Sequence, residues 1–274
     1  MPKIQGSAAI LLAALLWSSG GLFIKWIPLP ALAVAGGRAA VTSVFYLLVL
    51  RPKLRQARLS TALAYACMIM TFVAANKATT AASAVLLQYT GTAWVLMAGY
   101  RFFGERVTKI DVVAVVGCLG GMALCLLDDA VGITWQGNAL AAISGVFFAM
   151  AVILMRRDAQ VGSDSAQASI TVGNFIGAAV GLSLGGADLV HGLGWQPVAG
   201  LLWLGLLQMG ASYLLFLRGL RTVTASTASL LSLLEPAVSP MWVWLGTGER
   251  PGVATLAGGA LMLGSLAARA LLQR

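Results

Sequence analysis

The feature that most limits the fold of this 274-residue chain is a series of apolar runs, most of them about 20 residues long. A helix needs about 20 apolar residues to cross the roughly 30 Å hydrocarbon core of a bilayer. Hydrophobic residues make up 59% of the chain and charged residues 10%, against roughly 25% charged in soluble domains. The sequence therefore predicts an all-α integral membrane protein, surrounded by the lipid bilayer.

Ten transmembrane helices are predicted from these runs. The third has the weakest signal, because no clear loop separates it from the fourth. The first is too long and too poorly followed by small residues for a cleaved signal peptide, so we expect it to be retained. The ten spans are Ser7–Ile24, Pro30–Leu50, Ser60–Ala75, Thr80–Tyr100, Ile110–Leu127, Gln136–Met155, Ala166–Leu184, Pro197–Leu217, Val223–Leu245 and Val253–Leu271.

Several functional classes lack the residues that they need. The G-x-x-x-x-G-K nucleotide motif is absent, so no ATP hydrolysis is expected and no ATPase subunit is required. An enzyme within the membrane would need a Ser/His pair, paired aspartates or a histidine metal site, and none falls in the spans. His191 has no second His or Cys spaced to share a metal. We expect neither an enzyme nor a cofactor or metal site.

The net charge of +9 predicts orientation and not a nucleic-acid partner. With the amino terminus inside, fourteen Lys and Arg fall on one side of the membrane, while Lys25, Lys77 and Arg250 fall on the other and Arg38 lies within a span. Basic residues are enriched in cytoplasmic loops. The pattern predicts a multi-pass protein of a bacterial-type inner membrane with both termini in the cytoplasm.

The chain contains an internal repeat, seen when residues 80–106 are aligned with residues 224–250. Both segments end in the tripeptide GER, and an earlier pairing aligns Trp17 with Phe148 and Lys25 with Arg156. The predicted halves are residues 1–130 and 131–274. Each half has five spans, an odd number, so the two must have inverted topology. Inverted repeats around a midplane site are typical of secondary transporters.

These motifs resemble the EamA-type drug/metabolite transporter superfamily over nearly the whole chain. The segments that carry the resemblance are LLAALLWSS in the first span, Arg38 in the second, the GER after the fourth and LLEPAVSPMWVWLGTGER in the ninth. The resemblance implies a ten-helix exporter, most often of amino acids and other small metabolites, with a central cavity and peripheral fifth and tenth helices. Members often carry a proline where this chain has Thr92, so the fourth helix is expected to be straighter than the ninth.

Two charged side chains within the spans need compensation, because a charge at the bilayer centre costs roughly 2.5–3.5 kcal/mol. Glu235 could bind a substrate ammonium or a transported proton, or could be a protonated acid that holds the helix bend. Arg38 could bind a substrate carboxylate or pair internally, with Glu235 as one candidate. Pro236 and Pro240 free backbone carbonyls and predict an open or kinked helix that lines a cavity.

Deep aromatic and polar residues complete the predicted site. The candidate substrate-binding residues are Trp17, Ser18, Arg38, Gln88, Tyr89, Trp94, Tyr213, Ser232 and Glu235. Gly173, Gly177 and Gly181 form a smooth face that suits close helix packing or a moving helix, and with Pro236 and Pro240 they are the predicted structural or hinge positions. The leading hypothesis is a secondary transporter that exports small metabolites, amino acids first, by alternating access around a midplane cavity between the two repeats. Export of aromatic or cationic drugs or of other metabolites, and a channel-like facilitator, are the alternatives.

Overall fold

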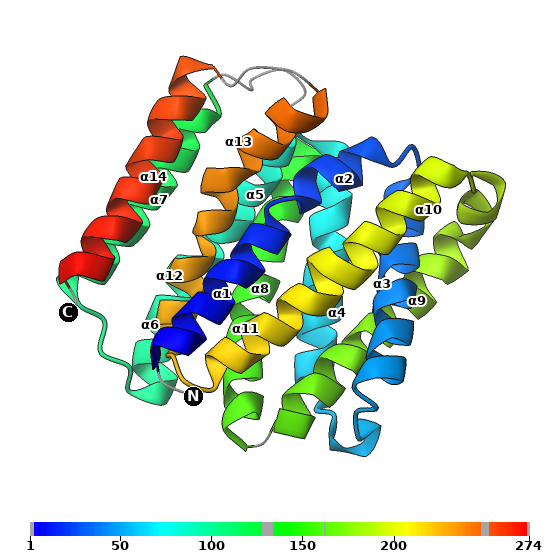
Figure 1. The fold of residues 1–274 in the computed structure, drawn as a ribbon, viewed down its shortest axis with the longest axis horizontal. Coiled ribbons are helices and arrows are strands. Elements are labelled where there is room, and N and C mark those ends of the chain that lie inside the picture. The colour runs from blue at the N-terminus through cyan, green and yellow to red at the C-terminus, as the bar shows by residue number, and fades with distance from the viewer. Residues whose placement is uncertain (1–2, 128–133, 162, 248–251, 273–274) are drawn as a thin grey trace.

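The structure of the protein is a computed structural model that describes residues 3–127, 134–161, 163–247 and 252–272. The described residues fold into a bundle of helices without strands (Figure 1). The helices are α1 (Lys3–Trp17), α2 (Gly20–Trp26), α3 (Ala31–Val49), η1 (Leu54–Gln56), α4 (Leu59–Ala78), α5 (Ala81–Tyr89), α6 (Gly91–Phe103), α7 (Lys109–Cys125), α8 (Trp135–Val161), α9 (Ser163–His191), α10 (Trp195–Leu202), η2 (Trp203–Ala211), α11 (Ser212–Leu220), α12 (Ala225–Ser232), α13 (Leu234–Thr247) and α14 (Val253–Leu272).

The predicted membrane spans correspond to these helices, some of which join end to end into one span. Within the described ranges, nine single or joined helices are long and apolar enough to cross a bilayer. The remaining predicted span, the fifth, is α7, which has 17 residues and lies at the short end of the range for membrane-spanning helices. The weak third span is confirmed as α4, which has 20 residues.

The contacts of α1 and α8 are equivalent in the two halves. The pairing of Trp17 with Phe148 also pairs Gly6 in α1 with Gly137 in α8. A Cβ at Gly6 would meet the Thr222 side chain, and a Cβ at Gly137 would meet that of Thr79. Each of these threonines lies just beyond the carboxyl end of the helix that the glycine approaches, α11 or α4. The two repeats therefore make equivalent contacts.

Two basic side chains at opposite ends of the bundle also make equivalent contacts in the two repeats. Lys25 of α2 donates to the carbonyl oxygen of Thr79 at 2.6 Å, and its repeat partner Arg156 of α8 donates to that of Leu220. Thr79 is also approached by Gly137, at the start of α8. The second repeat therefore begins at the end of the bundle where the first span ends, which is the arrangement expected of inverted repeats.

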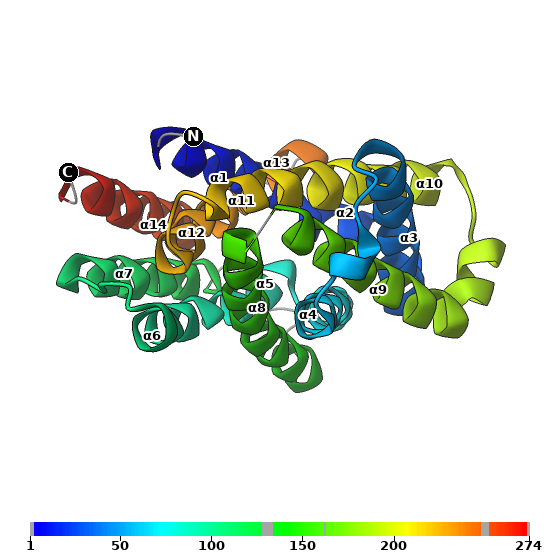
Figure 2. The same ribbon diagram turned by 90° about the horizontal axis from the view of Figure 1, so that it is seen from below.

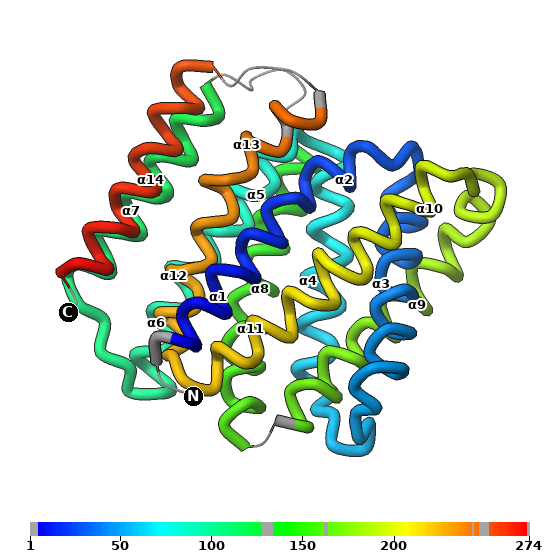
Figure 3. The backbone as a smooth tube through the Cα atoms, viewed as in Figure 1, coloured from blue at the N-terminus to red at the C-terminus, as the bar shows by residue number. Residues whose placement is uncertain are grey.

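Helices α7 and α14, the last of each half, lie side by side at one edge of the bundle (Figures 1, 2 and 3). They approach closely at Gly121 and Gly258, since a Cβ on either would come within 2.5 Å of the other's carbonyl oxygen. Arg269 Nε of α14 donates to Asp111 Oδ1 of α7 at 2.7 Å. The expectation of peripheral fifth and tenth helices agrees with this arrangement.

The glycine face of α9 packs against α3 and α4. At Gly181 a Cβ would lie 2.5 Å from the Cα of Gly36 in α3, and at Gly173 it would lie 2.7 Å from the carbonyl oxygen of Ala62 in α4. Gly177 has more room, with Ile69 of α4 as its nearest neighbour at 3.2 Å. Of the two interpretations of this face, close packing is the one these contacts support. The packing fixes α3, which carries Arg38, against the second repeat.

Three spans are interrupted near mid-length. The first breaks at Ser18 and Ser19, between α1 and α2; the fourth breaks at Thr90, between α5 and α6; and the ninth breaks at Leu233, between α12 and α13. The absence of a proline at Thr92 therefore does not keep the fourth span continuous. A turn at Thr90, whose hydroxyl donates to the carbonyl oxygen of Leu87 at 2.6 Å, interrupts the helix without a proline.

The ninth span breaks three residues before Pro236. The carbonyl of Ser232 cannot receive a helical hydrogen bond from Pro236, which has no N–H, so a break here is physically expected. Helix α13 continues through Pro240. The break therefore lies next to Pro236 and not at Pro240, and it places Glu235 in the first turn of α13.

Candidate functional site

A small cavity lies between the two halves and has a volume of about 40 Å³. Helices of both repeats contribute to it, from α1 to α5 on one side and from α8 to α13 on the other. Its lining residues are Trp17, Arg38, Met68, Ile69, Phe72, Gln88, Tyr89, Phe148, Gln208, Met209, Tyr213 and Glu235. Six of the nine predicted binding residues therefore line one space, namely Trp17, Arg38, Gln88, Tyr89, Tyr213 and Glu235.

The interruptions in the helices place several of these side chains. Trp17 is the last residue of α1, Tyr89 is the last residue of α5, and Glu235 is the second residue of α13. Broken helices are tolerated at membrane depth where they line a cavity, and they are frequent at transporter binding sites. The cavity therefore lies where the backbone departs from regular helix.

A further irregular segment, η2, is a π-helix that carries the lining residues Gln208 and Met209. Residues in such wide turns are displaced from the regular helical faces, and π-helical turns are frequent at functional sites. Neither residue was among the sequence predictions. Gln208 offered a signal, because it is an uncharged polar residue in a mostly apolar span, whereas Met209 offered none.

Arg38 is the basic residue of the cavity and is only 2% exposed. Its Nη2 donates to the carbonyl oxygen of Ile69 at 3.0 Å, and its Nη1 makes a long contact of 3.4 Å with Gln208 Oε1. Within the described part of the chain, its Nε has no hydrogen-bond partner. Both contacts are with uncharged groups, so the positive charge is not neutralised by them.

Glu235 is the acidic residue of the cavity and is 6% exposed. The hydroxyl of Tyr89 donates to its Oε2 at 2.6 Å. Among the described residues no ion pair joins Glu235 to Arg38. The structure therefore does not support the internal Arg38–Glu235 pair, and it places two groups of opposite charge separately around one cavity.

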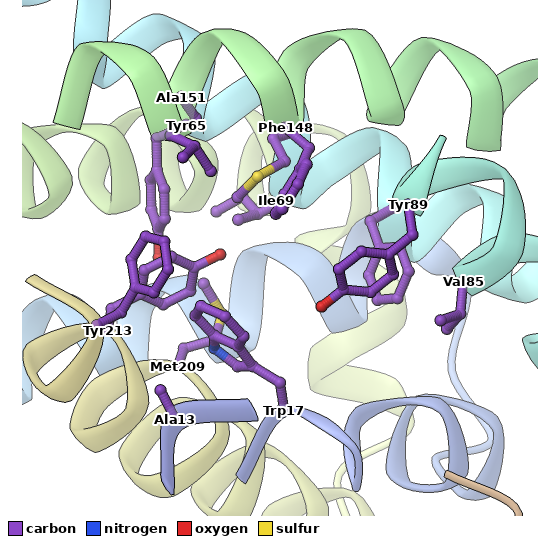
Figure 4. Packing of buried hydrophobic residues seen from close by; sticks show 14 of the residues in the cluster. Ala13, Trp17, Tyr65, Ile69, Val85, Tyr89, Phe148, Ala151, Met209 and Tyr213 are labelled. Carbon is purple, nitrogen blue, oxygen red and sulfur yellow. The ribbon is translucent and has the colours of Figure 1, made fainter. Parts of the chain in front are cut away.

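Aromatic rings form much of the remaining wall. The ring of Trp17 lies 4.9 Å from that of Tyr213, and the ring of Tyr89 lies 5.4 Å from that of Phe148. Figure 4 shows these residues and Met209 around a common space, with the Tyr89 hydroxyl pointing toward Trp17. Trp17 and Phe148 are the pair aligned by the internal repeat, so equivalent positions of the two halves contribute aromatic rings to the same cavity.

Gln88 joins the cavity to α8 through a short hydrogen-bond chain. Its Nε2 donates to Ser144 Oγ at 2.8 Å, and Ser144 Oγ donates to the carbonyl oxygen of Met68 at 3.2 Å. These bonds link α4, α5 and α8. Gln88 is thereby held by neighbouring helices at the edge of the cavity.

Three predicted binding residues lie outside the cavity. Trp94 is 54% exposed and does not line the cavity, so the structure does not bring it together with the other predicted binding residues. Ser18 accepts a hydrogen bond from Trp242 Nε1 at 2.7 Å, and Ser232 donates to the carbonyl oxygen of Ala228 at 2.9 Å. Ser18 and Ser232 therefore stabilise the helices beside the cavity and do not line it.

The model of the EamA-like transporter family matches this chain twice, over residues 4–127 and residues 135–268. The chain belongs to the EamA-like transporter family. The two matches correspond to the two halves of the bundle. This EamA protein is a multi-pass membrane transporter of the drug/metabolite type, as predicted from the repeated GER and the ninth span.

Structural comparison finds the same fold in a solved structure. A solved structure entitled "Crystal structure of protein" superposes on the EamA protein with a TM-score of 0.76, at 18% identity, and the match covers 97% of this chain and 96% of the other. At that identity the likeness shows the fold alone. No curated protein matches the chain significantly.

Proposed function

We propose that this EamA protein is a secondary exporter of amino acids that works by alternating access around the cavity between its repeats. The observation that carries the proposal is the separate placement of Arg38 and Glu235 in one aromatic-lined cavity. A zwitterionic amino acid presents a carboxylate and an ammonium, which these two side chains complement. Each buried charge would then gain a partner of opposite charge from the substrate.

The aromatic and methionine side chains favour amino acids with apolar or aromatic side chains. Ligand pockets combine such apolar walls with a few polar groups that fix orientation. A cationic compound would use Glu235 and the aromatic rings but would leave Arg38 without a partner. The presence of Arg38 therefore favours an amino acid over a cationic drug.

The size of the cavity supports alternating access over a channel. Ligand pockets have volumes of roughly 300–1,000 Å³, so a cavity of about 40 Å³ is too small for an amino acid. Substrate binding would require the helices to move apart. The contacts of Lys25 and Arg156 close opposite ends of the bundle, and their exchange would open the cavity to one side at a time.

The proposed orientation follows from the charge pattern. The basic loops would face the cytoplasm of a bacterial-type inner membrane, which places the Arg156 contact at the cytoplasmic end and the Lys25 contact at the outer end. An excess of amino acid in the cytoplasm would then drive export, with or without a coupled proton. Glu235 is the carboxyl group of the cavity and would be the site of such a proton.

The decisive experiment is counterflow in proteoliposomes that contain the purified protein. Liposomes loaded with unlabelled phenylalanine, leucine or threonine are expected to accumulate the same labelled amino acid transiently and with saturation. A carrier shows this trans-stimulation and a channel does not. Saturable transport of a cationic drug without transport of any amino acid would overturn the proposed substrate class.

Glu235→Gln is expected to reduce amino-acid transport about tenfold, because the substrate ammonium loses a charged hydrogen-bond partner. Tyr89 should keep a hydrogen-bond acceptor, since the glutamine amide oxygen can accept the hydrogen bond that its hydroxyl donates. The measurement compares phenylalanine with phenylpropionate, which has no ammonium group. Equal loss for both compounds would instead show that Glu235 acts on the structure of the helix break.

The contacts that Lys25 and Arg156 make at opposite ends of the bundle give a separate prediction. In a protein whose native cysteines are replaced by alanine, a cysteine at Met209 reports access to the cavity. Lys25→Ala is expected to increase its labelling by an impermeant thiol reagent from the outer side, and Arg156→Ala from the cytoplasmic side, because each loses one closing contact. Lys53→Ala, which removes an exposed ion pair with Asp164, is the control. Increased labelling from the same side in both variants would contradict alternating access.

A further inference from the structure

The tryptophans next to the first helix break differ in how their indole nitrogens are bonded. Trp242 Nε1 donates to Ser18 Oγ at 2.7 Å, and Trp203 Nε1 donates to Ser19 Oγ at 3.0 Å. Trp17, which directly precedes these serines, is 5% exposed. Its Nε1 has no hydrogen-bond partner within the described residues.

The hydroxyl groups of both serines already donate one hydrogen bond and accept another. Ser18 Oγ donates to the carbonyl oxygen of Leu15 at 2.6 Å, and Ser19 Oγ donates to that of Leu16 at 2.8 Å, while each accepts from a tryptophan of the second repeat. Their bonding is fixed by the break between α1 and α2. The local structure therefore provides hydrogen-bond acceptors for two indole N–H groups and none for the third, which belongs to a residue that lines the cavity.

A buried N–H without a partner is costly, and such groups in native proteins call for an explanation. Arg38 Nε is a second donor in the same condition, and it belongs to another lining residue of this cavity. Both residues are at least nine-tenths buried. Two unsatisfied donors, one of them charged, on residues that line one cavity are complementary to an anionic acceptor with two oxygens.

The positions of the neighbouring groups favour a carboxylate that is part of a larger molecule. Figure 4 shows the Trp17 indole extending into the space between Tyr89 and Tyr213. Tyr89 carries the hydrogen bond to Glu235, so an acidic group also borders this space. A small free anion would gain nothing from Glu235, whereas an amino acid would have its ammonium near Glu235 and its carboxylate near the donors.

We propose that the Trp17 indole N–H and Arg38 bind the substrate carboxylate together, so that Trp17 is a specificity-determining residue that selects amino acids over the corresponding amines. The inference rests on the proposed amino-acid transport. Arg38 supplies the charge, and the indole supplies a second donor whose direction is fixed by ring packing against Tyr213 and Phe216. Binding would satisfy donors that the protein itself leaves without partners.

The test compares phenylalanine with phenylethylamine, which lacks only the carboxylate. Trp17→Phe keeps an aromatic ring and removes the N–H. It is expected to raise the half-saturating concentration of phenylalanine about tenfold, as for loss of one hydrogen bond to a charged group, and to leave that of phenylethylamine unchanged. Trp242→Phe is the matched control, since its indole is bonded to Ser18 and does not line the cavity.

A second variant separates the effect of losing the hydrogen bond from the effect of changing the shape of the ring. Benzothienylalanine incorporated at position 17 has nearly the shape of tryptophan, with sulfur in place of N–H, and it should reproduce the effect of Trp17→Phe. Unchanged phenylalanine affinity in this variant would overturn the inference while leaving amino-acid transport intact. Failure of the wild-type protein to transport any amino acid would overturn the proposed function itself.

Discussion

Arg38→Gln is expected to abolish measurable transport of carboxylate-bearing substrates while the protein remains folded. Removal of one partner from a buried charged hydrogen-bonded pair costs about 2–5 kcal/mol, which corresponds to at least a thirtyfold loss of affinity. Here the pair would form only when substrate is bound, because the contacts of Arg38 within the protein are with Ile69 and Gln208. The measurement is saturable efflux of labelled phenylalanine and phenylethylamine from proteoliposomes.

The control for this prediction is Arg269→Gln. Arg269 is also buried, but it pairs with Asp111 at the peripheral contact between α7 and α14. Its replacement should lower stability and affect phenylalanine and phenylethylamine alike. Arg38→Gln should discriminate between them. Loss of both substrates in a folded Arg38 variant would assign Arg38 to the architecture of α3 and not to carboxylate binding.

The charged members of the cavity were predictable from the sequence, whereas their relation to each other was not. Arg38 and Glu235 are conspicuous because a charge in an apolar span needs a compensating environment. That argument allowed the two to be partners. Whether the two side chains contact each other depends on the rotation and depth of α3 and α13, and hydrophobic runs alone predict neither quantity.

The helix breaks could be predicted from the sequence only where a proline is present. Pro236 gave a signal for the break at Leu233, because a proline removes a backbone donor. The breaks at Ser18 and at Thr90 have no proline, and there serine and threonine hydroxyls bond to nearby carbonyl oxygens. Such residues also occur within regular membrane helices, so their presence does not distinguish a break from a continuous span.

Trp17 and Trp94 show why depth does not identify a cavity residue. Both lie well inside predicted spans, and both are predicted to bind substrate. The structure turns Trp17 into the bundle with 5% exposure and turns Trp94 outward with 54% exposure. The spans have apolar residues on all faces, since lipid and protein interior are both apolar, and the hydrophobic pattern therefore does not define which face is buried.

The glycine contact between α3 and α9 leads to the largest expected effect on stability. Gly181→Ala would place a Cβ 2.5 Å from the Cα of Gly36 and 2.6 Å from its backbone nitrogen. Both atoms are backbone, so relief requires α3 and α9 to separate. We expect a loss of about 3 kcal/mol or more in the free energy of unfolding, at the upper end for overpacked sites, and a weakened transport site because α3 carries Arg38.

Gly186→Ala on the same helix is the matched control, because its Cβ would have only the Leu182 side chain within reach, at 4.0 Å. Since alanine favours a helix over glycine by about 1 kcal/mol, this variant should be as stable as the wild type or more stable. The measurement is unfolding of both variants in the same detergent, followed by denaturant or heat. If Gly181→Ala proved as stable as Gly186→Ala, the close contact of α3 with α9 would be wrong, and with it the depth at which Arg38 enters the cavity.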